Sequence, residues 1–362
     1  MSTFAFLGWF FWSTLSFVWA IDPGWSYRKI FFLINFLLLF IVLIGQKETT
    51  FKRIFRWYVG GAVGISSVAI LQSLLQLVVD PGVVLLFWTE KLLPFFLGSN
   101  FAASVATYPS LLVNILGKTY FRATGFFPDP HIFSYYVAMA IPFTCLYWKK
   151  NFFGWSRLVS LLLFLGLLLS FSRGGYVAIA ASFLWFLLLI FFFEKKQKIA
   201  LWIIAASSIS LFALVSPVGN RFISSFTSGD GSRSERVQLA YTALEAIRER
   251  PFLGVGVGNY PLWVKPEALS REPIYAHNLY LDIAAELGLV GLSLFLIAVF
   301  GALFESFQKW KLSKDPFYLA LHIALVYFLV HGFFEAPIFS VHVLPVFLLI
   351  IAACFVKSDI KT

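Results

Sequence analysis

The stretch that decides the fold is residues 277–291, HNLYLDIAAELGLVG, which leads into an apolar run at 283–304. A polar, arginine-rich segment precedes it, so the chain passes here from a polar loop into a long hydrophobic helix. At about 100° per residue, one face of this helix collects His277, Leu281, Ala284, Gly288 and Gly291, and Asp282 and Glu286 fall opposite. Small residues let another membrane helix approach closely, so we expect this face to pack tightly and to present the imidazole at its polar end. A His-Asn pair that only caps an ordinary span is the alternative interpretation.

The composition places the chain among the membrane proteins. Of its 362 residues, 60% are hydrophobic and 44 are Phe, which excludes an ordinary soluble domain. Apolar runs near the length of a bilayer crossing recur at 4–21, 30–46, 57–79, 131–148, 153–171, 175–193, 199–216, 283–304, 316–334 and 340–356. Charges and prolines interrupt 82–118, which is either two further spans or a set of interfacial helices. The sequence predicts an all-α polytopic integral membrane protein with about 10–12 transmembrane helices.

The longest polar segment divides the chain into three predicted parts. N-terminal transmembrane helices occupy 1–216, with an external segment at 82–130; an external loop occupies 217–282; C-terminal transmembrane helices occupy 283–362. Within the loop, Ser232 and Glu235 form a capping box that opens a helix ending at Pro251. Apolar residues at helical spacing predict a stripe that lies over the membrane, formed by Val237, Ala240, Tyr241, Leu244 and Ile247.

Lysine and arginine are distributed unequally between the two predicted sides of the membrane. With the N-terminus in the cytoplasm, cytoplasmic segments carry 12 Lys and 3 Arg, and external segments carry 4 Lys and 9 Arg. Lys-rich cytoplasmic loops follow the positive-inside rule, whereas the external arginines run against it. Because guanidinium binds phosphate through paired hydrogen bonds, these arginines predict an anionic ligand. Contact with anionic lipid headgroups is the alternative, which fits Arg122 and Arg173 less well because each lies at a membrane boundary near glycine.

Glycines at 254, 256 and 258 suggest a nucleotide-binding loop, but their context does not support one. They follow a helix and a proline rather than a strand, and no acidic residue completes a strand-helix-strand unit. We expect Gly254 and Gly256 to form a tight backbone that approaches a phosphate or packs against the mouth of the membrane region. The histidines are scattered and no external Asp-x-Asp pair is present, so we predict no metal and no other cofactor.

Four segments in this order resemble the O-antigen ligase and polymerase family of bacterial envelope glycosyltransferases. They are RATGFF at 122–127, SFSRGG at 170–175, Arg236 followed by PFLGVGVGNY at 251–260, and the stretch 277–291. The resemblance covers roughly residues 110–340. The chain departs from the family pattern at His131, where Asn is common. Its external loop is short, which makes the pilin-glycosylating branch a poor match and leaves ligase and polymerase open.

The resemblance implies a glycosyltransferase C-like helical bundle in the bacterial inner membrane, with its active site facing the periplasm. Family members take a glycan from undecaprenyl pyrophosphate. Ligases pass it to lipid A-core oligosaccharide, and polymerases pass it to another lipid-linked repeat unit. We expect an O-antigen ligase whose partners are these lipids and the membrane, and not nucleic acid; a polymerase is the alternative. An anion transporter is a third interpretation, disfavoured because the predicted spans are nearly free of charge.

This reaction needs a proton acceptor and a clamp for the departing pyrophosphate. An imidazole titrates near neutral pH, so His277 is the predicted general base. Arg173 and Arg236 are the predicted catalytic arginines, which stabilise phosphate charge without a metal. The predicted substrate-binding residues are Arg122, Gly254, Gly256, Asn278 and Glu335. Asn278 either orients the imidazole or caps its helix, and Glu335 is both the alternative proton acceptor and, four residues after His331, its expected partner on one helical face.

Overall fold

The computed structural model describes residues 2–115, 117–145, 155–194, 231–268 and 274–356. The chain divides into two compact units, each built from segments that are distant in sequence. Unit 1 comprises Met1–Leu39, Ala180–Ala302 and Gly332–Ala336. Unit 2 comprises Phe40–Ile179, Leu303–His331 and Pro337–Thr362.

Long apolar helices dominate the described residues, as the composition predicts. Four of them are long and apolar enough to cross a bilayer: α2 (Pro23–Ile44), α3 (Glu48–Leu75), α9 (Arg173–Glu194) and α14 (Leu279–Ser313). Shorter helices occupy the other predicted runs: α1 (Ser2–Leu15) with η1 (Ser16–Trp19), α7 (Pro130–Cys145), α8 (Trp155–Leu169), α15 (Pro316–His331) and α16 (Leu344–Phe355). The expected run at 199–216 lies outside the described residues. The all-α polytopic membrane architecture is confirmed, and the full number of crossings stays a prediction.

Unit 2 is organised around α7, which packs against α3, α8 and α15, while α16 packs against α15. Aromatic side chains fill these interfaces. Phe55 of α3 stacks on Phe143 of α7 with ring centroids 4.2 Å apart, and Phe328 of α15 stacks on Phe347 of α16 at 4.3 Å. Such pairs add to the free energy of simple apolar burial, which accounts for the use of Phe in this core.

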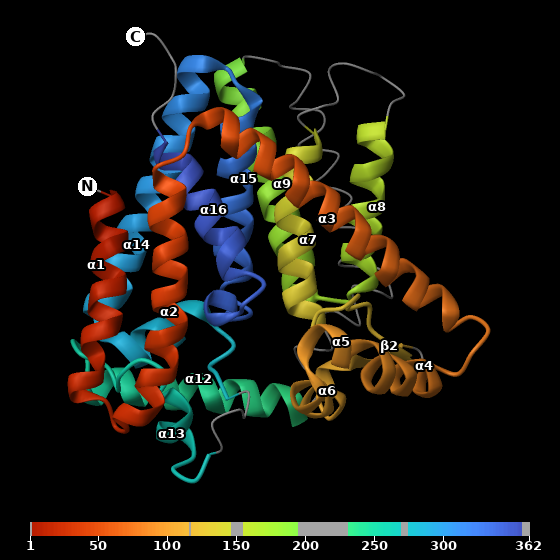
Figure 1. The fold of residues 1–362 in the computed structure, drawn as a ribbon, viewed down its shortest axis with the longest axis horizontal. Coiled ribbons are helices and arrows are strands. Elements are labelled where there is room, and N and C mark those ends of the chain that lie inside the picture. The colour runs from red at the N-terminus through yellow and green to blue at the C-terminus, as the bar shows by residue number, and fades with distance from the viewer. Residues whose placement is uncertain (1, 116, 146–154, 195–230, 269–273, 357–362) are drawn as a thin grey trace. The chain divides into compact units, whose positions relative to one another are not determined.

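The segment 82–118 forms short helices and a hairpin rather than long helices, and its place at the membrane interface stays a prediction. It forms α4 (Pro81–Phe87), the π turn η2 (Trp88–Leu92), α5 (Leu93–Leu97), α6 (Ser99–Ala106) and η3 (Pro109–Leu111), followed by a hairpin of β1 (Leu112–Ile115) and β2 (Lys118–Phe121). These pieces bury a core of their own, centred on Val84, Trp88 and Phe121. Figure 1 shows α5 and α6 at one end of α7 rather than alongside it.

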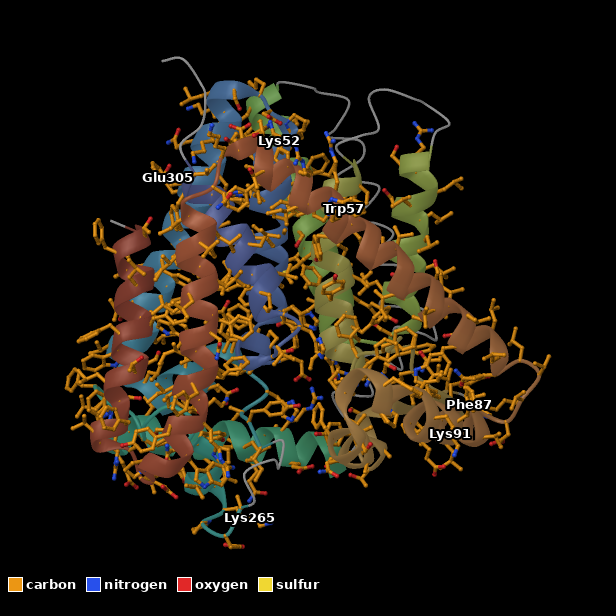
Figure 2. All side chains as sticks on the ribbon, in the orientation of Figure 1. Lys52, Trp57, Phe87, Lys91, Lys265 and Glu305 are labelled. Atoms are coloured by element: carbon orange, nitrogen blue, oxygen red, sulfur yellow. The ribbon has the colours of Figure 1, made fainter. Side chains whose placement is uncertain are left out.

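The two ends of unit 2 differ in their charged residues. Figure 2 shows Lys52 and Glu305 at one end, and Phe87 and Lys91 at the opposite end. Lys52 forms ion pairs of 2.6 Å with both Glu48 and Asp315. The end with Lys52 therefore carries a network of paired charges, the opposite end carries α4 to α6 with Lys91, and the compartment that each end faces stays a prediction.

Unit 1 contains α1, α2, the first part of α14 and two helices of the polar loop, α12 (Gly231–Glu249) and α13 (Tyr260–Val264). Figure 1 shows α12 running across the end of α1 and α2, with α13 beside it. Three residues of the apolar stripe predicted for α12, Val237, Tyr241 and Leu244, are exposed, and whether the stripe lies over the membrane stays a prediction. The helix instead buries Ala243 and Ala246, whose small side chains permit the close packing of α12 with the core around Ala285 of α14. The side chain of Ser232 lies outside the described residues.

Helix α14 is interrupted at Gly288, where φ is 67° and ψ is −177°. The continuous helical face predicted from His277 to Gly291 is therefore wrong. The break removes the helical partners of three carbonyl groups, and groups distant in sequence replace them at 2.9 Å. Ala285, Glu286 and Leu287 accept hydrogen bonds from Val255 N, Gly256 N and the indole of Trp12, respectively. A buried backbone carbonyl that lacks a partner is costly, so Trp12 of α1 and the loop that contains Val255 and Gly256 together stabilise the break in α14.

Candidate active site

His277 ends the polar loop and lies outside α14. Its φ is 51°, in the left-handed region, and its side chain is 19% exposed. The next residue, Asn278, caps the helix, because its Oδ1 accepts the backbone N–H groups of Tyr280 and Leu281 at 3.0 and 3.1 Å. Asn278 Nδ2 also donates to the carbonyl of Phe333 at 3.3 Å. Of its two expected roles, the structure shows the cap.

Glu335 lies between an imidazole and a guanidinium, and we call this group the His–Glu–Arg cluster. Its Oε2 is 3.1 Å from His277 Nδ1, and its Oε1 is 3.1 Å from a terminal nitrogen of Arg236. The carboxylate side chain is only 6% exposed, whereas that of Arg236 is 35% exposed. Three segments of unit 1 therefore supply one cluster: the end of the polar loop before α14, helix α12 and the segment 332–336.

The end of α15 explains why Glu335 can reach this position. The helix ends at His331, so the expected helical pair between His331 and Glu335 is wrong. The carbonyl of Gly332 accepts the N–H of Leu279 at 2.7 Å, which fastens the segment after α15 to the start of α14. Glycine immediately after a helix is a stop signal, and it is the sequence feature that could have indicated this ending.

The cluster has the arrangement of a base held by a carboxylate. With Nδ1–H donating to Glu335, the imidazole keeps Nε2 as its proton acceptor. Within the described residues, His277 Nε2 makes no hydrogen bond. A carboxylate on the first nitrogen fixes the tautomer and stabilises the imidazolium that forms when the second nitrogen takes a proton. The group can therefore accept a proton from a hydroxyl placed at Nε2.

Arg236 is held in place through its helix. Tyr260 of α13 donates from its hydroxyl to the carbonyl of Leu239 at 2.5 Å, one turn after Arg236 in α12. Burial, together with the nearby carboxylates of Asp282 and Glu286, raises the pKa of Tyr260. The phenol therefore stays protonated and keeps this donor at neutral pH.

The sequence interpretation gave no role to Asp282, which contacts the loop before His277. Its Oδ1 accepts the backbone N–H of Ala276 at 2.7 Å, and both residues are buried. An acidic residue in the first turn of a helix is a capping signal, so the sequence did contain a hint of this contact.

Gly254 and Gly256 belong to the loop that compensates for the break in α14. Their φ values are 70° and 94°, which favour glycine. A Cβ atom on Gly254 would lie 2.5 Å from the carbonyl carbon of Glu286, and one on Gly256 would lie 2.6 Å from the Cα of Ala20. Of the two expectations for this loop, close backbone packing is present, and a contact with phosphate stays a prediction.

Arg122 and Arg173 lie in unit 2, where their surroundings differ. Arg122 is 7% exposed, and its guanidinium donates to the carbonyls of Ser110, Ser170 and Phe171 at 2.8 to 3.1 Å. Arg173 begins α9 directly after this Ser170–Phe171 turn and is exposed. Arg122 therefore fixes the turn that precedes Arg173, and binding of substrate by either arginine stays a prediction.

A second histidine cluster occupies the interior of unit 2. Ser172 Oγ is 3.0 Å from His131 Nδ1 and 3.4 Å from His331 Nε2. The other ring nitrogen of His331 is 2.9 Å from the hydroxyl of Tyr327, and Tyr135 stacks on the same ring at 3.8 Å. His131 stands where the family pattern commonly has Asn, and here it serves as a partner of Ser172.

Comparison with known families gives a match over the middle of the chain. Residues 158–296 match the model of a family described as O-Antigen ligase. No curated protein sequence matches the chain. Six candidate residues lie within the matched range: Arg173, Arg236, Gly254, Gly256, His277 and Asn278. Arg122 and Glu335 lie outside it.

Proposed function

We propose that the chain, whose residues 158–296 match the model of the O-antigen ligase family, transfers a glycan from undecaprenyl pyrophosphate to lipid A-core oligosaccharide. The family match supports the class of reaction, and the His–Glu–Arg cluster supports the mechanism. The observation that carries the proposal is Glu335, whose two carboxylate oxygens lie at 3.1 Å from His277 and from Arg236.

His277 is the general base of the proposed reaction. Its Nε2 takes the proton of the acceptor hydroxyl as that oxygen attacks the anomeric carbon of the donor glycan. The bond from this carbon to the pyrophosphate oxygen breaks, and the electron pair leaves with undecaprenyl pyrophosphate. Glu335 holds Nδ1–H and stabilises the positive charge that develops on the ring. Proton removal by a positioned base contributes about 10²–10⁴-fold to rate.

Arg236 stabilises the departing pyrophosphate. A guanidinium has five N–H donors, and within the described residues Glu335 is its one charged partner. The remaining donors and the partial exposure of the side chain suit a phosphate ligand that arrives from solvent. The planar guanidinium of Arg236 would then donate hydrogen bonds to the phosphate in a fixed geometry, which the mobile ammonium group of a lysine could not provide.

Arg173 is proposed as a second pyrophosphate ligand on the strength of its sequence pattern and its exposed position at the start of α9. Arg173→Ala should keep expression and thermal stability and lose most transfer activity. Arg173→Lys should also be poor, because lysine keeps the charge and loses the bidentate geometry. Full activity of the lysine variant would favour simple attraction of anionic lipids.

The acceptor separates the ligase from the polymerase. Purified protein should be given undecaprenyl-pyrophosphate glycan with either lipid A-core or a second lipid-linked repeat unit. Product on lipid A-core is the expected result, and lengthened lipid-linked glycan would replace the proposal by a polymerase. His277→Ala serves as the inactive control in both assays. Absence of both products with the native protein would contradict glycan transfer from this donor.

The proposed location is the bacterial inner membrane, with the cluster facing the periplasm. The lysine-rich loops on the predicted cytoplasmic side, with 12 Lys against 4 on the external side, support this orientation. Single cysteines at Glu267 and Lys311, both exposed positions, should react with an impermeant thiol reagent from the periplasmic and cytoplasmic side, respectively. The native Cys145 and Cys354 are replaced by Ser in this background. Equal labelling of both sites from one side would overturn the orientation.

A further inference from the structure

The peptide that leads into His277 is fixed by a buried carboxylate. Asp282 Oδ1 accepts the N–H of Ala276 at 2.7 Å. Ala276 is 2% exposed and Asp282 is 6% exposed, so water cannot readily replace this bond. A buried N–H without a partner is unfavourable. The hydrogen bond to Asp282 therefore favours the loop conformation in which the N–H of Ala276 points at this carboxylate.

His277 needs such support because of its own backbone. A φ of 51° is uncommon for a residue with a side chain, and it persists where the neighbouring structure fixes it. The following side is held by the cap of Asn278 and by the bond from Leu279 N to the carbonyl of Gly332. Asp282 provides the anchor on the preceding side. The backbone on both sides of His277 is thus held by hydrogen bonds, and the imidazole lies within hydrogen-bond distance of the carboxylate of Glu335.

Asp282 also has charged neighbours, which offer a competing explanation. Lys29 of α2 and Glu286 of α14 both interact electrostatically with it. If Asp282 affected His277 only through its negative charge, removal of the charge of Glu286 should have a similar effect, because Glu286 is equally buried and lies one turn further along the same helix. Only Asp282 bonds the peptide before His277 within the described residues.

We propose that Asp282 is a positioning residue for His277: it fixes the Ala276 peptide so that the imidazole keeps Nδ1 on Glu335 and Nε2 toward the acceptor hydroxyl. The proposal rests on the proposed function, in which His277 is the base. The carboxylate itself takes no proton in the reaction, so an uncharged acceptor of the same shape should replace it.

The test compares Asp282→Ala with Asp282→Asn, and uses Glu286→Gln as the matched control. Asp282→Ala should lower kcat by about 10²-fold, the effect expected when a catalytic group is displaced by about 1 Å, and leave KM for the donor unchanged. Asp282→Asn keeps an oxygen acceptor and should restore kcat to within about threefold of the native value. Glu286→Gln should resemble the native protein. If Asp282→Asn and Glu286→Gln lower kcat as much as Asp282→Ala does, the negative charge of these carboxylates and not the hydrogen bond to Ala276 would explain the loss, and the proposal would be overturned.

Two further measurements separate this inference from the proposed function. Amide hydrogen exchange of the peptide containing Ala276 and His277 should be faster in Asp282→Ala and native-like in Asp282→Asn, whatever the reaction catalysed. Unchanged exchange in the Ala variant would refute the anchor itself. In a His277→Ala background, Asp282→Ala should cause no further loss of kcat. An additional loss there would show that Asp282 acts by another route, whereas full activity of His277→Ala alone would refute the base and leave the exchange result standing.

Discussion

The two histidine clusters of the molecule use similar side chains in opposite ways. In unit 1, His277 has one ring nitrogen on Glu335 and a partly exposed side chain. In unit 2, His331 is completely buried, both of its ring nitrogens have partners, and Tyr135 covers its face. A base must offer an accessible nitrogen to its substrate. The ring nitrogens that already have hydrogen-bond partners, and not the presence of histidine alone, therefore distinguish a candidate base from a structural residue.

The same contrast applies to the arginines. Arg122 donates to three carbonyl oxygens and is nearly buried, whereas Arg236 has one carboxylate partner among the described residues and remains about one-third exposed. Donors that already bind backbone are not available to a ligand. Arg122 therefore has the contacts of a structural residue, and Arg236 has those of a residue that can receive an anion.

Removal of each histidine tests whether His277 is a base and His331 is a structural residue. His277→Ala should lower the single-turnover rate by about 10²–10⁴-fold, because the base is lost, and keep donor affinity and Tm. His331→Ala should instead lower stability by roughly 1–3 kcal/mol, because Ser172 and Tyr327 lose a buried partner. Donor affinity, rate and Tm are to be measured on the same preparations. Collapse of donor affinity in His277→Ala with a normal chemical step would make His277 a binding residue.

Exchange of the arginines gives the next largest expected effect. Arg236→Ala should lower kcat/KM by about 10–100-fold, in line with the loss of a charged hydrogen bond, and Arg236→Lys should recover little of it. Arg122→Ala should mainly lower Tm, because the three carbonyl groups of Ser110, Ser170 and Phe171 lose their hydrogen-bond donor. Thermal unfolding and transfer assays on both variants check this. Equal losses of Tm in the two variants would remove the distinction between them.

The sequence was sufficient for features that depend on periodicity and local chemistry. Apolar runs located the helices because burial in a membrane requires continuous hydrophobic length, and Pro251 marked the end of α12. His277 was placed correctly at the junction of polar loop and helix. Each of these conclusions needs only residues that are neighbours in the chain.

Features that depend on distant residues could not be predicted in the same way. A single glycine within an apolar run is compatible with a helix, and the break at Gly288 exists because Trp12 and the loop 251–256 supply its missing partners. The contact of Glu335 with His277 follows from the end of α15 at His331. The apolar run at 316–334 predicted a helix that continues to residue 334, and that helix would have placed Glu335 beside His331 instead.

Glu335→Gln tests whether the charge of the carboxylate contributes beyond its hydrogen bond to His277, and we expect a smaller effect than for His277→Ala. The amide oxygen can still accept Nδ1–H, so the imidazole keeps its orientation, but the charge that stabilises imidazolium is lost. We expect kcat to fall by about tenfold, the equivalent of roughly 1.4 kcal/mol, with little change in Tm. Glu335→Ala should be worse, since both the charge and the acceptor are removed. A steady-state transfer assay decides, and equal kcat values for the Gln and Ala variants would show that orientation by Glu335 is unimportant.

The last prediction concerns the glycines, and it tests whether the His–Glu–Arg cluster depends on the backbone packing of the loop that contains Gly254. Gly254→Ala places a Cβ 2.5 Å from the carbonyl carbon of Glu286 at a φ of 70°. Both the contact and the left-handed backbone are unfavourable, so stability should fall by roughly 1–3 kcal/mol. Gly60→Ala in α3 of unit 2 is the matched control, since a Cβ there meets no atom within 4 Å, and it should be neutral or stabilising by up to about 1 kcal/mol. Thermal unfolding of both variants, each with and without donor lipid, makes the measurement. A Gly254→Ala protein with native Tm would mean that α14 shifts to accept the methyl group, and the rate of that variant would then show how far His277 moves with it.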